Sequence, residues 1–502
     1  MQKRHFLYCV VCIVGGCAKA PSPAPRSAPP PASDPTPAQK AAGATPASQV
    51  DARTRAARPH VARAPKKAAE LIARGKSLQA KQGKKGAKDA VALYEAALRA
   101  DPFAAEALWE LGWSHQVLQQ WDAALAAWSH LARLNPDYPE LETYYPVLKM
   151  RYDAARALAN LPATGEMPPP ELTPRAGPRL RIKAVGDIQM GRGWPEEHAA
   201  LPENQGKPLF AQVRSTLRNA DITFGNLETV LADSGESSKC RQGASACYAF
   251  RAPTRFTQAL VDAGFDVLSI ANNHTGDFGP QGRKATMAAL DTAGLLHSGP
   301  VDDIASWEVK GLRIALVAFA TGAGLYRLQD IDTARRVVAA LDREHDLVFV
   351  SFHGGAEGRS AQHVPKATEM FYGENRGNVY AFAHAMVDTG ADVVLGHGPH
   401  VLRGMEIYRG RFIAYSLGNF SAWTGFNLAG PLGKTAIVDL HIAPNGVALK
   451  AALTPIHIEQ PGVPRPDPQR RAIRIIRRLS AADLGDPLFD RNGKWVRPDG
   501  SS

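Results

Sequence analysis

Cysteine is scarce in this chain, with five residues in 502. Cys9, Cys12 and Cys17 stand within the first seventeen residues, so only Cys240 and Cys247 remain for the rest of the chain. Two cysteines without a second pair nearby argue against a structural zinc site, which usually needs four ligands. They lie in a loop rich in Ser and Gly, where a local disulfide fits an oxidising compartment. Free thiols or soft metal ligands are the alternatives.

Long hydrophobic runs are also missing. The apolar stretch Phe6–Val14 is shorter than the about 20 residues that cross a bilayer, but it follows basic residues as a signal-peptide core does. The sequence Val14-Gly15-Gly16-Cys17 resembles a lipobox. We therefore predict a lipoprotein-type signal peptide at residues 1–17 and export, with Cys17 anchoring the protein to the membrane facing the periplasm or the cell exterior. An ordinary secretory signal is the alternative.

Acidic residues do not balance the basic ones, and the net charge is +11. The excess is local, because Arg53–Lys88 holds twelve basic residues against one acid, Glu70. Such a block beside a lipid anchor suits contact with anionic headgroups or an anionic polymer, and a solvated surface is the alternative. Aromatic residues make up only 7% of the chain and do not interleave with the basic ones, so we expect no nucleic-acid partner.

The first part of the chain divides by composition. Proline, alanine and serine dominate residues 18–62, which predicts an extended linker. For residues 63–162 we predict a basic helix and tetratricopeptide-like repeats. The repeat signal is the spacing of 34 residues from Pro102 to Pro136, with small and aromatic positions such as Trp128 on two packed helices. Repeats of this kind bind a protein partner, and a plain spacer is the alternative.

A proline-rich linker at 163–178 precedes the main domain, predicted at 179–460, and a basic tail follows at 461–502. In the main domain, short β-branched runs alternate with helical patterns, which predicts an α/β fold. Five of these runs are Arg179–Val185, Asp221–Gly225, Asp266–Ala271, Asp346–Phe352 and Ala391–Gly396. Polar motifs follow each run, at the strand ends where open α/β sheets bind ligands.

Carboxylate, amide and imidazole side chains make up these motifs, at Asp187, Glu228, Asn273, His274, His353, His397 and His400. Carboxylates and imidazoles together suit borderline-to-hard divalent ions. Two such ions bridged by a carboxylate would clamp the attacking and the leaving oxygen of a hydrolysis. A lone histidine near a strand is more often structural, but five motifs on one sheet edge together predict a dinuclear metal site.

The motifs GDIQMGRG, GNLETVL, ANNHTGDFG, FHGGAE and GHGPHVLRGMEIYRGRFIAYSLGNF follow one another between Gly186 and Phe420. In composition and order they resemble the CapA, or poly-γ-glutamate capsule-biosynthesis, family, a branch of the calcineurin-like metallophosphoesterase superfamily. The resemblance covers about 180–458. It implies a two-sheet sandwich flanked by helices, preceded here by the small all-α module. It also implies a part in making or processing capsule polymer.

The resemblance assigns roles to these residues. The implied metal ligands are Asp187 for the first ion, Glu228 as the bridge, Asn273 and His353 for the second ion, and His397 and His400 to complete the two sites. His274 would be the imidazole outside the ligand set that protonates a leaving group or steadies the transition state. Asn419 and Arg192 would orient ligands or grip an anion. The ions would be divalent, such as Mn, Fe or Zn.

One position departs from the superfamily pattern. Gln189 stands where the first superfamily motif has histidine, and an amide is the poorer metal ligand, so the first ion would be weakly bound or absent.

Two functions follow from these residues. The first is a metal-dependent hydrolase of a phosphoester or γ-glutamyl amide bond, favoured by the asparagine and histidines. The alternative, favoured by Gln189, is a non-catalytic polymer-binding or assembly component of an envelope polymer export complex.

Overall fold

The computed structural model describes residues 64–118, 120–195, 199–237, 239–240 and 248–496. The chain divides into two compact units, with the boundary between Tyr138 and Pro139. The predicted signal peptide, the linker at 18–62, Cys17 and Cys247 lie outside the described residues. Within these ranges, every helix is too short or too polar to span a bilayer.

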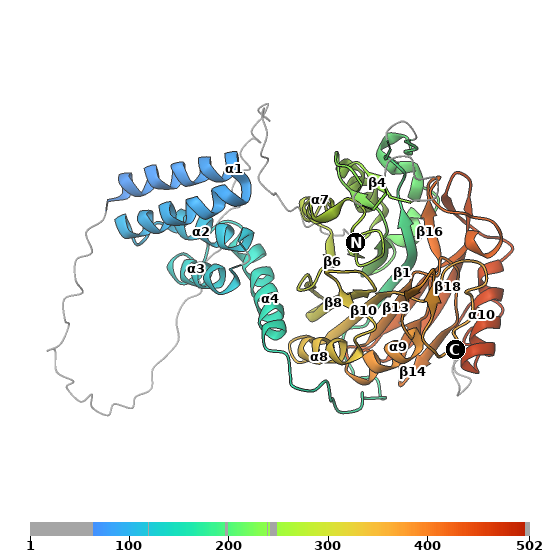
Figure 1. Ribbon diagram of the computed structural model, residues 1–502. Coiled ribbons are helices and arrows are strands. Elements are labelled where there is room, and N and C mark those ends of the chain that lie inside the picture. Colours follow the sequence, from blue (N-terminus) through green and yellow to red (C-terminus); the bar gives the residue numbers. More distant parts are fainter. Residues whose placement is uncertain (1–63, 119, 196–198, 238, 241–247, 497–502) are drawn as a thin grey trace, which may run out of the picture. The chain divides into compact units, whose positions relative to one another are not determined.

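The first unit is helical and begins with an element that folds back on itself. α1 is assigned to Pro65–Ala100, a length that would span roughly 54 Å as one straight helix. Its ends are instead adjacent, because the Ala64 amide donates to the Ala100 carbonyl at 2.8 Å. Tyr94 donates a hydrogen bond to Gln79 at 2.6 Å, so the two halves lie side by side (Figure 1). The element is therefore a helical hairpin.

A second helix pair follows, formed by α2 (Ala105–Val117) and α3 (Trp121–Leu134). Trp128 of α3 is fully buried and stacks on Trp109 at 4.7 Å between ring centroids. Its indole approaches Gly112 so closely that a Cβ there would overlap the ring. The two helix pairs occupy the places that the repeat pattern predicts, and their classification as tetratricopeptide repeats stays a prediction.

The next helix, α4 (Leu141–Ala159), belongs to the second unit. Its residues Ala154 and Leu158 pack into a core cluster of that unit, and Arg156 lies 3.3 Å from Glu344. The predicted repeat region at 63–162 thus extends past the helical unit, because α4 packs on the strand Ala305–Val309 and the helix Ile331–Asp342 of the second unit.

Two mixed sheets form the second unit. The first has the order β19-β18-β17-β1-β2-β5-β6, with β16 paired to β1. Its strands are β1 (Leu180–Gln189), β2 (Ile222–Leu227), β5 (Val267–Ser269), β6 (Leu296–Ser298), β16 (Asn419–Ala422), β17 (Lys434–Ile442), β18 (Ala448–Glu459) and β19 (Val463–Pro466). The second has the order β14-β15-β13-β10-β8-β7, with β9 paired to β8. Its strands are β7 (Ala305–Val309), β8 (Leu312–Ala320), β9 (Tyr326–Arg327), β10 (Leu347–His353), β13 (Val393–His397), β14 (Met405–Tyr408) and β15 (Arg411–Ala414).

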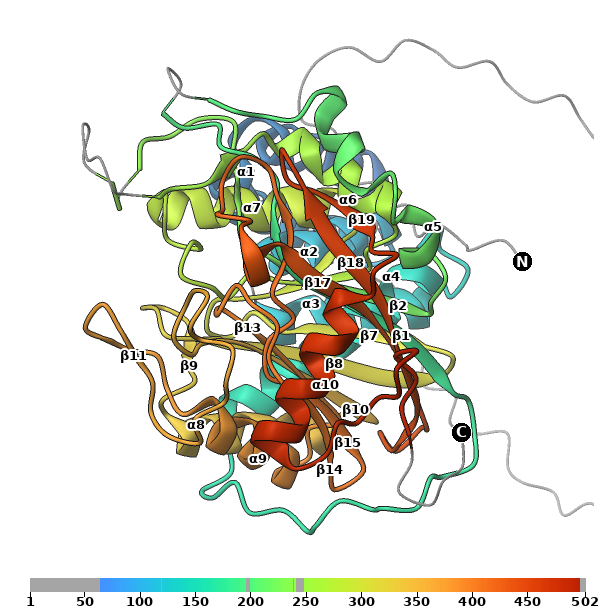
Figure 2. The same ribbon diagram turned by 90° about the vertical axis from the view of Figure 1, so that its right-hand side faces the viewer.

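The sheets pack face to face, since one buried cluster joins Ile182 and Phe224 of the first to Leu316 and Phe349 of the second. Helices flank their outer faces (Figures 1 and 2). They are α6 (Thr257–Ala263) and α7 (Gly279–Thr292) against the first sheet, and α8 (Ile331–Asp342) and α9 (Val379–Asp388) against the second. The predicted α/β two-sheet sandwich flanked by helices is confirmed.

Shorter elements complete the unit. They are α5 (Arg214–Leu217), the 3-10 helices η2 (Asn204–Phe210), η3 (Thr254–Phe256) and η4 (Gly430–Gly433), and the strand pairs β3 (Val230–Leu231) with β4 (Arg251–Ala252) and β11 (Met370–Phe371) with β12 (Glu374–Asn375).

The chain after residue 461 is part of this unit as far as Val496, not the separate basic tail that composition predicts. β19 pairs with β18, and α10 (Arg471–Leu484) packs on β14, β17 and β18 (Figure 2). Ile473 and Ile476 of α10 are buried in the core cluster shared by the two sheets. The helical spacing of the apolar residues among the arginines predicts an amphipathic surface or docking helix at Gln469–Leu479, and α10 covers most of that range.

Candidate metal centre

Parallel strand pairing brings the motifs of the first sheet together. In the register, Asp187 of β1 lies opposite Asn226 of β2 on one side and Asn419 of β16 on the other. The Asp187 amide donates to the Gly418 carbonyl at 2.9 Å. That carbonyl would overlap a Cβ at position 186, so the Gly-Asp sequence is required by the close approach of the backbones.

The second sheet supplies the histidines. β10 and β13 are parallel, and their last residues, His353 and His397, are directly opposite each other. His397 Nδ1 lies 3.0 Å from Asp187 Oδ1, and His400 Nδ1 lies 3.1 Å from Asp187 Oδ2. Asp187 therefore joins the edges of the two sheets. Burial alone would raise the pKa of Asp187, but hydrogen bonds from the two histidines outweigh it and hold the pKa below its usual range.

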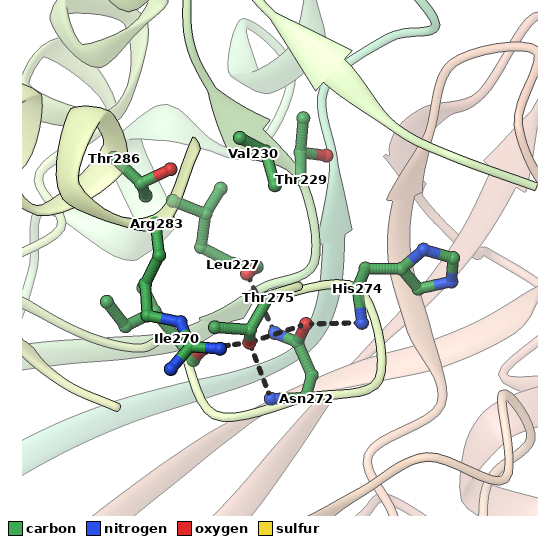
Figure 3. Close-up of a pocket in the computed structure, with 9 residues that line it drawn as sticks. All are labelled: Leu227, Thr229, Val230, Ile270, Asn272, His274, Thr275, Arg283 and Thr286. Carbon is green, nitrogen blue, oxygen red and sulfur yellow. Dashed lines mark hydrogen bonds between the residues drawn. The ribbon is translucent and has the colours of Figure 1, made fainter. Parts of the chain in front are cut away.

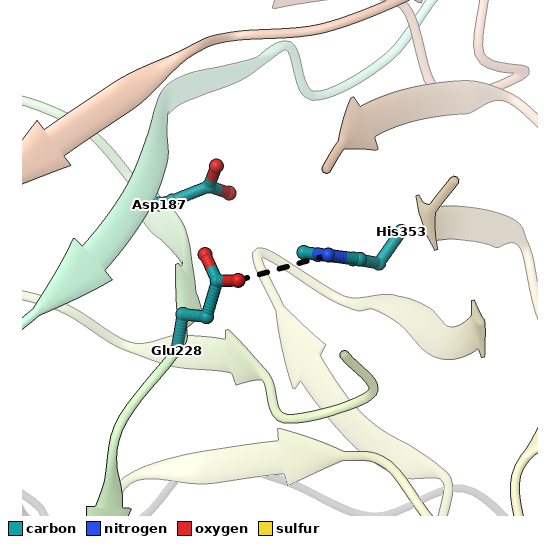
Figure 4. Close-up of side chains that lie close together, drawn as sticks. All are labelled: Asp187, Glu228 and His353. Atoms are coloured by element: carbon teal, nitrogen blue, oxygen red, sulfur yellow. Dashed lines mark ion pairs between the residues drawn. The ribbon is translucent and has the colours of Figure 1, made fainter. Parts of the chain in front are cut away.

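Asp187, Glu228 and His353 form a compact group of potential ligands (Figure 4). One ligand atom from each lies within 4.8 Å of the others, and all three side chains are buried. His353 Nε2 is 3.7 Å from Glu228 Oε1, and neither this nitrogen nor either Glu228 oxygen has a hydrogen-bond partner. Burial lowers the pKa of His353 well below its usual range, so the ring is neutral, as a metal ligand must be.

The charge balance around Glu228 also fits a cation. Burial raises the pKa of Glu228 well above its usual value. Burial alone would lower the pKa of His400, but the Glu228 and Asp187 carboxylates raise it to about 10. The His400 imidazolium is therefore a cation beside Glu228 in the metal-free protein, with Nε2 3.8 Å from Glu228 Oε1. A divalent ion would supply that positive charge and release the proton, so these residues can hold a metal ion.

The remaining predicted ligands lie at the same place. His397 Nε2 and Asn273 Oδ1 are buried without hydrogen-bond partners, as expected of atoms reserved for a ligand. Asn273 Nδ2 donates to Glu357 Oε1 at 3.4 Å, and Glu357 Oε2 lies 3.9 Å from His400 Nε2. Contacts thus link all six predicted ligands, directly or through Glu357, and the tightest group is Asp187, Glu228 and His353.

His274 is held by a carboxylate that sequence analysis does not single out. Its Nδ1 lies 2.7 Å from Asp277 Oδ2, while its Nε2 faces Glu228 Oε1 at 3.9 Å. Burial lowers the pKa of His274 despite the opposing effect of Asp277. In the neutral ring, donation from Nδ1 to Asp277 leaves a lone pair on Nε2, so His274 can accept a proton on the side of the cluster.

Hydrogen bonds of Asn272 fix the turn that carries His274 (Figure 3). Asn272 donates to the Leu227 carbonyl at 2.9 Å and accepts the His274 amide at 3.1 Å. Beside it lies a cavity of about 10 Å³, lined in part by Thr275 and Arg283. A cavity of this size has room for about one water molecule. The position of His274 is therefore set by a closed hydrogen-bonded turn rather than by a loose loop.

Aromatic rings cover one side of the centre. Phe426 lies 4.6 Å from the His400 ring and 5.2 Å from Phe250, whose ring lies 4.5 Å from His274. Such rings keep water from the histidines on that side.

Three predicted positions differ in how they relate to the cluster. Asn419 Oδ1 accepts a hydrogen bond from His400 Nδ1 at 3.0 Å, so it orients a candidate ligand. Arg192 donates to the Trp194 carbonyl at 3.4 Å, and among the described residues no contact joins it to the cluster. Gln189 is fully buried against Gly425 with both amide atoms unpaired.

Cys240 takes part in a disulfide, and its pairing with Cys247 stays a prediction.

Comparison of the sequence with known proteins identifies the family of this chain. Residues 181–422 match the family described as bacterial capsule synthesis protein PGA_cap. A capsule biosynthesis protein CapA from Bacillus anthracis is 32% identical over 317 residues, which cover 58% of this chain and 70% of the relative. The PGA biosynthesis protein CapA of Bacillus subtilis (strain 168) is 29% identical over 344 residues, covering 64% and 81%. The chain belongs to the CapA family.

The CapA family match covers the candidate metal centre but not the whole chain. It contains every predicted metal ligand from Asp187 to His400, together with Asn419, and it excludes the helical unit and α10. Among solved structures, a purple acid phosphatase from yellow lupin seeds aligns with a TM-score of 0.29 and 11% identity, over 57% of this chain and 52% of that one. That likeness is too weak to support an argument, and the CapA assignment rests on sequence.

Proposed function

We propose that this CapA-family protein is an exported, lipid-anchored, metal-dependent hydrolase that acts in the biosynthesis or processing of capsular poly-γ-glutamate or another envelope polymer. The observation that carries the proposal is the group of Asp187, Glu228 and His353, whose ligand atoms lie within 4.8 Å of one another beside His274. Those of Glu228 and His353 have no hydrogen-bond partner. The names of the CapA relatives from Bacillus support the polymer.

A first divalent ion would be held by Asp187, Glu228 and His353. The site would be completed, or a second ion held, by Asn273, His397 and His400. Mn, Fe and Zn suit this mixture of oxygen and nitrogen ligands. When bound, such an ion acts as a Lewis acid on the bond to be broken and lowers the pKa of water. The protein's own contribution is the neutral His274, which accepts or returns a proton at Nε2 while Asp277 fixes its ring.

The bond broken would be a phosphoester or a γ-glutamyl amide. The test is to incubate the metal-loaded full chain with a chromogenic phosphoester and with poly-γ-glutamate, and to follow release of phenolate and shortening of the polymer. Cleavage of either, absent from a His397→Ala, His400→Ala double variant, supports the proposal. Metal-loaded protein that cleaves neither would reject catalysis on these bonds.

The non-catalytic alternative rests on one observation. Gln189 stands at a position where the superfamily has a histidine ligand, and its amide packs against Gly425. A protein that binds polymer without cleaving it would serve as an assembly component of an export complex, with the helical unit recruiting a protein partner. Stoichiometric binding of poly-γ-glutamate by a protein without hydrolytic activity would favour this alternative.

Membrane anchoring makes a separate prediction. The Cys17→Ala variant should move from the membrane fraction to the soluble fraction, because a protein without the acylated cysteine lacks its lipid chains. Immunoblotting of fractionated cells measures this partition, with a Cys12→Ala variant as the matched control. If Cys17→Ala stays with membranes like the control, the lipid-anchor proposal is wrong.

A further inference from the structure

A second feature of the sheet unit has no role in the candidate metal centre. It is an open groove of about 600 Å³ beside α10. Its lining residues are Gln362, Gly430, Pro431, Lys434, Arg471, Arg474, Ile475 and Arg478. Four of the eight are cationic and none is acidic. We call this feature the α10 groove.

The cationic side of the groove is an ordered helix face. Arg471, Arg474 and Arg478 follow one another at i, i+3 and i+7, so they lie along one side of α10. Asp467 pairs with Arg471 at 2.9 Å and neutralises it in part. Arg474 and Arg478 are exposed, and no carboxylate among the described residues pairs with either. The groove therefore presents two guanidinium groups without a carboxylate partner, and Arg474 donates one of its hydrogen bonds to the Gln469 carbonyl.

The helix that carries them is firmly held. Ile473 and Ile476 are buried in the core, and Ser480 accepts the Met405 amide at 2.8 Å. At its far end Asp483 pairs with His363 at 2.7 Å. Because the backbone of this helix is already fixed, only the arginine side chains lose conformational freedom when the face binds an anion.

Both walls of the groove are fastened to the metal centre. Pro431 precedes Leu432, whose carbonyl accepts from Asn419 at 3.1 Å, and Asn419 contacts His400. On the other side, Gln362 follows a segment in which the Gly358 amide donates to the Pro399 carbonyl at 3.0 Å. Each wall is thus a few residues and one or two hydrogen bonds from His400. A linear ligand in the groove would therefore contact segments that adjoin those holding His400.

We propose that the α10 groove binds a linear polycarboxylate chain and guides it to the metal centre. Successive arginines on the face are separated by about 4.5 and about 6 Å along the helix axis. In an extended γ-glutamyl chain, five backbone bonds separate neighbouring carboxylates by roughly 6 Å. Guanidinium groups bind carboxylates through charge-assisted, often bidentate, hydrogen bonds. This inference rests on the proposed function for its polymer, and it names where that polymer binds.

The experiment measures binding of fluorescein-labelled poly-γ-glutamate to the full chain by fluorescence anisotropy. Arg474→Glu combined with Arg478→Glu should bind about tenfold more weakly than the wild type, with unchanged metal content. The matched control combines Lys284→Glu and Lys450→Glu, which make the same change in net charge at exposed positions on α7 and β18. Binding should also weaken as NaCl is raised, because salt screens exposed charges.

Two further arms separate the possible outcomes. Glu228→Gln, which alters only the metal centre, should bind the polymer as the wild type does. Unlabelled poly-γ-glutamate should displace the probe better than polyphosphate of equal charge. Equal binding by the groove variant and the wild type would overturn the inference, and so would better displacement by polyphosphate. Groove-dependent binding by a wild type that cleaves no polymer would keep the inference while rejecting the proposed hydrolase.

Discussion

Glu228→Gln should abolish the stabilisation of this protein by divalent metal. In the wild type, metal at a hundred to a thousand times its dissociation constant should add about 3 to 4 kcal/mol of stability. Glutamine has the shape of glutamate but lacks the charge that the ion requires. Thermal unfolding with chelator and with added metal measures the effect, as a shift of the melting transition of the sheet unit. Glu308→Gln, at an exposed position on β7, is the matched control and should keep the full shift.

Without metal, the order of stability of the wild type and the Glu228→Gln variant should be reversed. Both Glu228 oxygens are buried without hydrogen bonds, so the variant should be at least as stable as the wild type in chelator. Despite its burial, His400 has its pKa raised to about 10 by the Glu228 and Asp187 carboxylates, so the folded state keeps a proton that the unfolded state has lost. The metal-free wild type should therefore lose stability as the pH rises from the usual histidine range toward about 10, and the variant, which lacks one of these charges, should lose less. Equal metal-induced shifts in the two proteins would refute the role of Glu228.

His274→Asn should lower kcat by about 10² to 10⁴ while leaving the bound metal unchanged. The reason is that Nε2 of this ring faces the cluster at 3.9 Å from Glu228, without belonging to the compact ligand group. Steady-state kinetics on the substrate found in the hydrolysis screen, paired with elemental analysis, measures both quantities. His363→Asn, on the rim of the sheet unit and paired with Asp483, is the control histidine. Loss of metal together with activity would instead make His274 a ligand.

Asp277 acts on the reaction only through His274. Asp277→Asn keeps an acceptor for the Phe250 amide, which donates to the native carboxylate at 2.9 Å. It removes the negative charge that favours the protonated His274. We therefore expect a smaller loss of kcat than in His274→Asn. The limb of the pH–rate profile that reports the ionisation of His274 should move to lower pH. A loss of activity without any movement of the profile would indicate a merely structural role.

Much of this arrangement follows from sequence because parallel strands carry their polar motifs to one edge. The runs that end before Asp187, Glu228 and His353 are regular β-branched segments, and the structure contains each of them as a strand. Register then determines which residues meet, and His353 opposite His397 is a consequence of parallel pairing between β10 and β13. Local pattern and long-range pairing agree at these positions.

Other features depend on contacts that no local pattern reveals. Asp277 pairs with His274 because a tight turn brings residues three apart together, whereas Glu357 reaches His400 and Asn273 from a loop after β10. The fold-back of α1 is not marked by proline. The burial of α10 depends on sheet strands far away in the chain, while its arginines dominate the local composition. Tertiary packing decides these positions.

The metal content of the purified full chain is the measurement to make first. Elemental analysis should find about one to two equivalents of manganese, iron or zinc per chain, the range set by a mononuclear or a dinuclear site. The His397→Ala, His400→Ala double variant should lose this metal while keeping the circular dichroism of the wild type. A wild type that holds no stoichiometric metal, even after reconstitution with each of these ions, would contradict the metal centre and the hydrolase built on it.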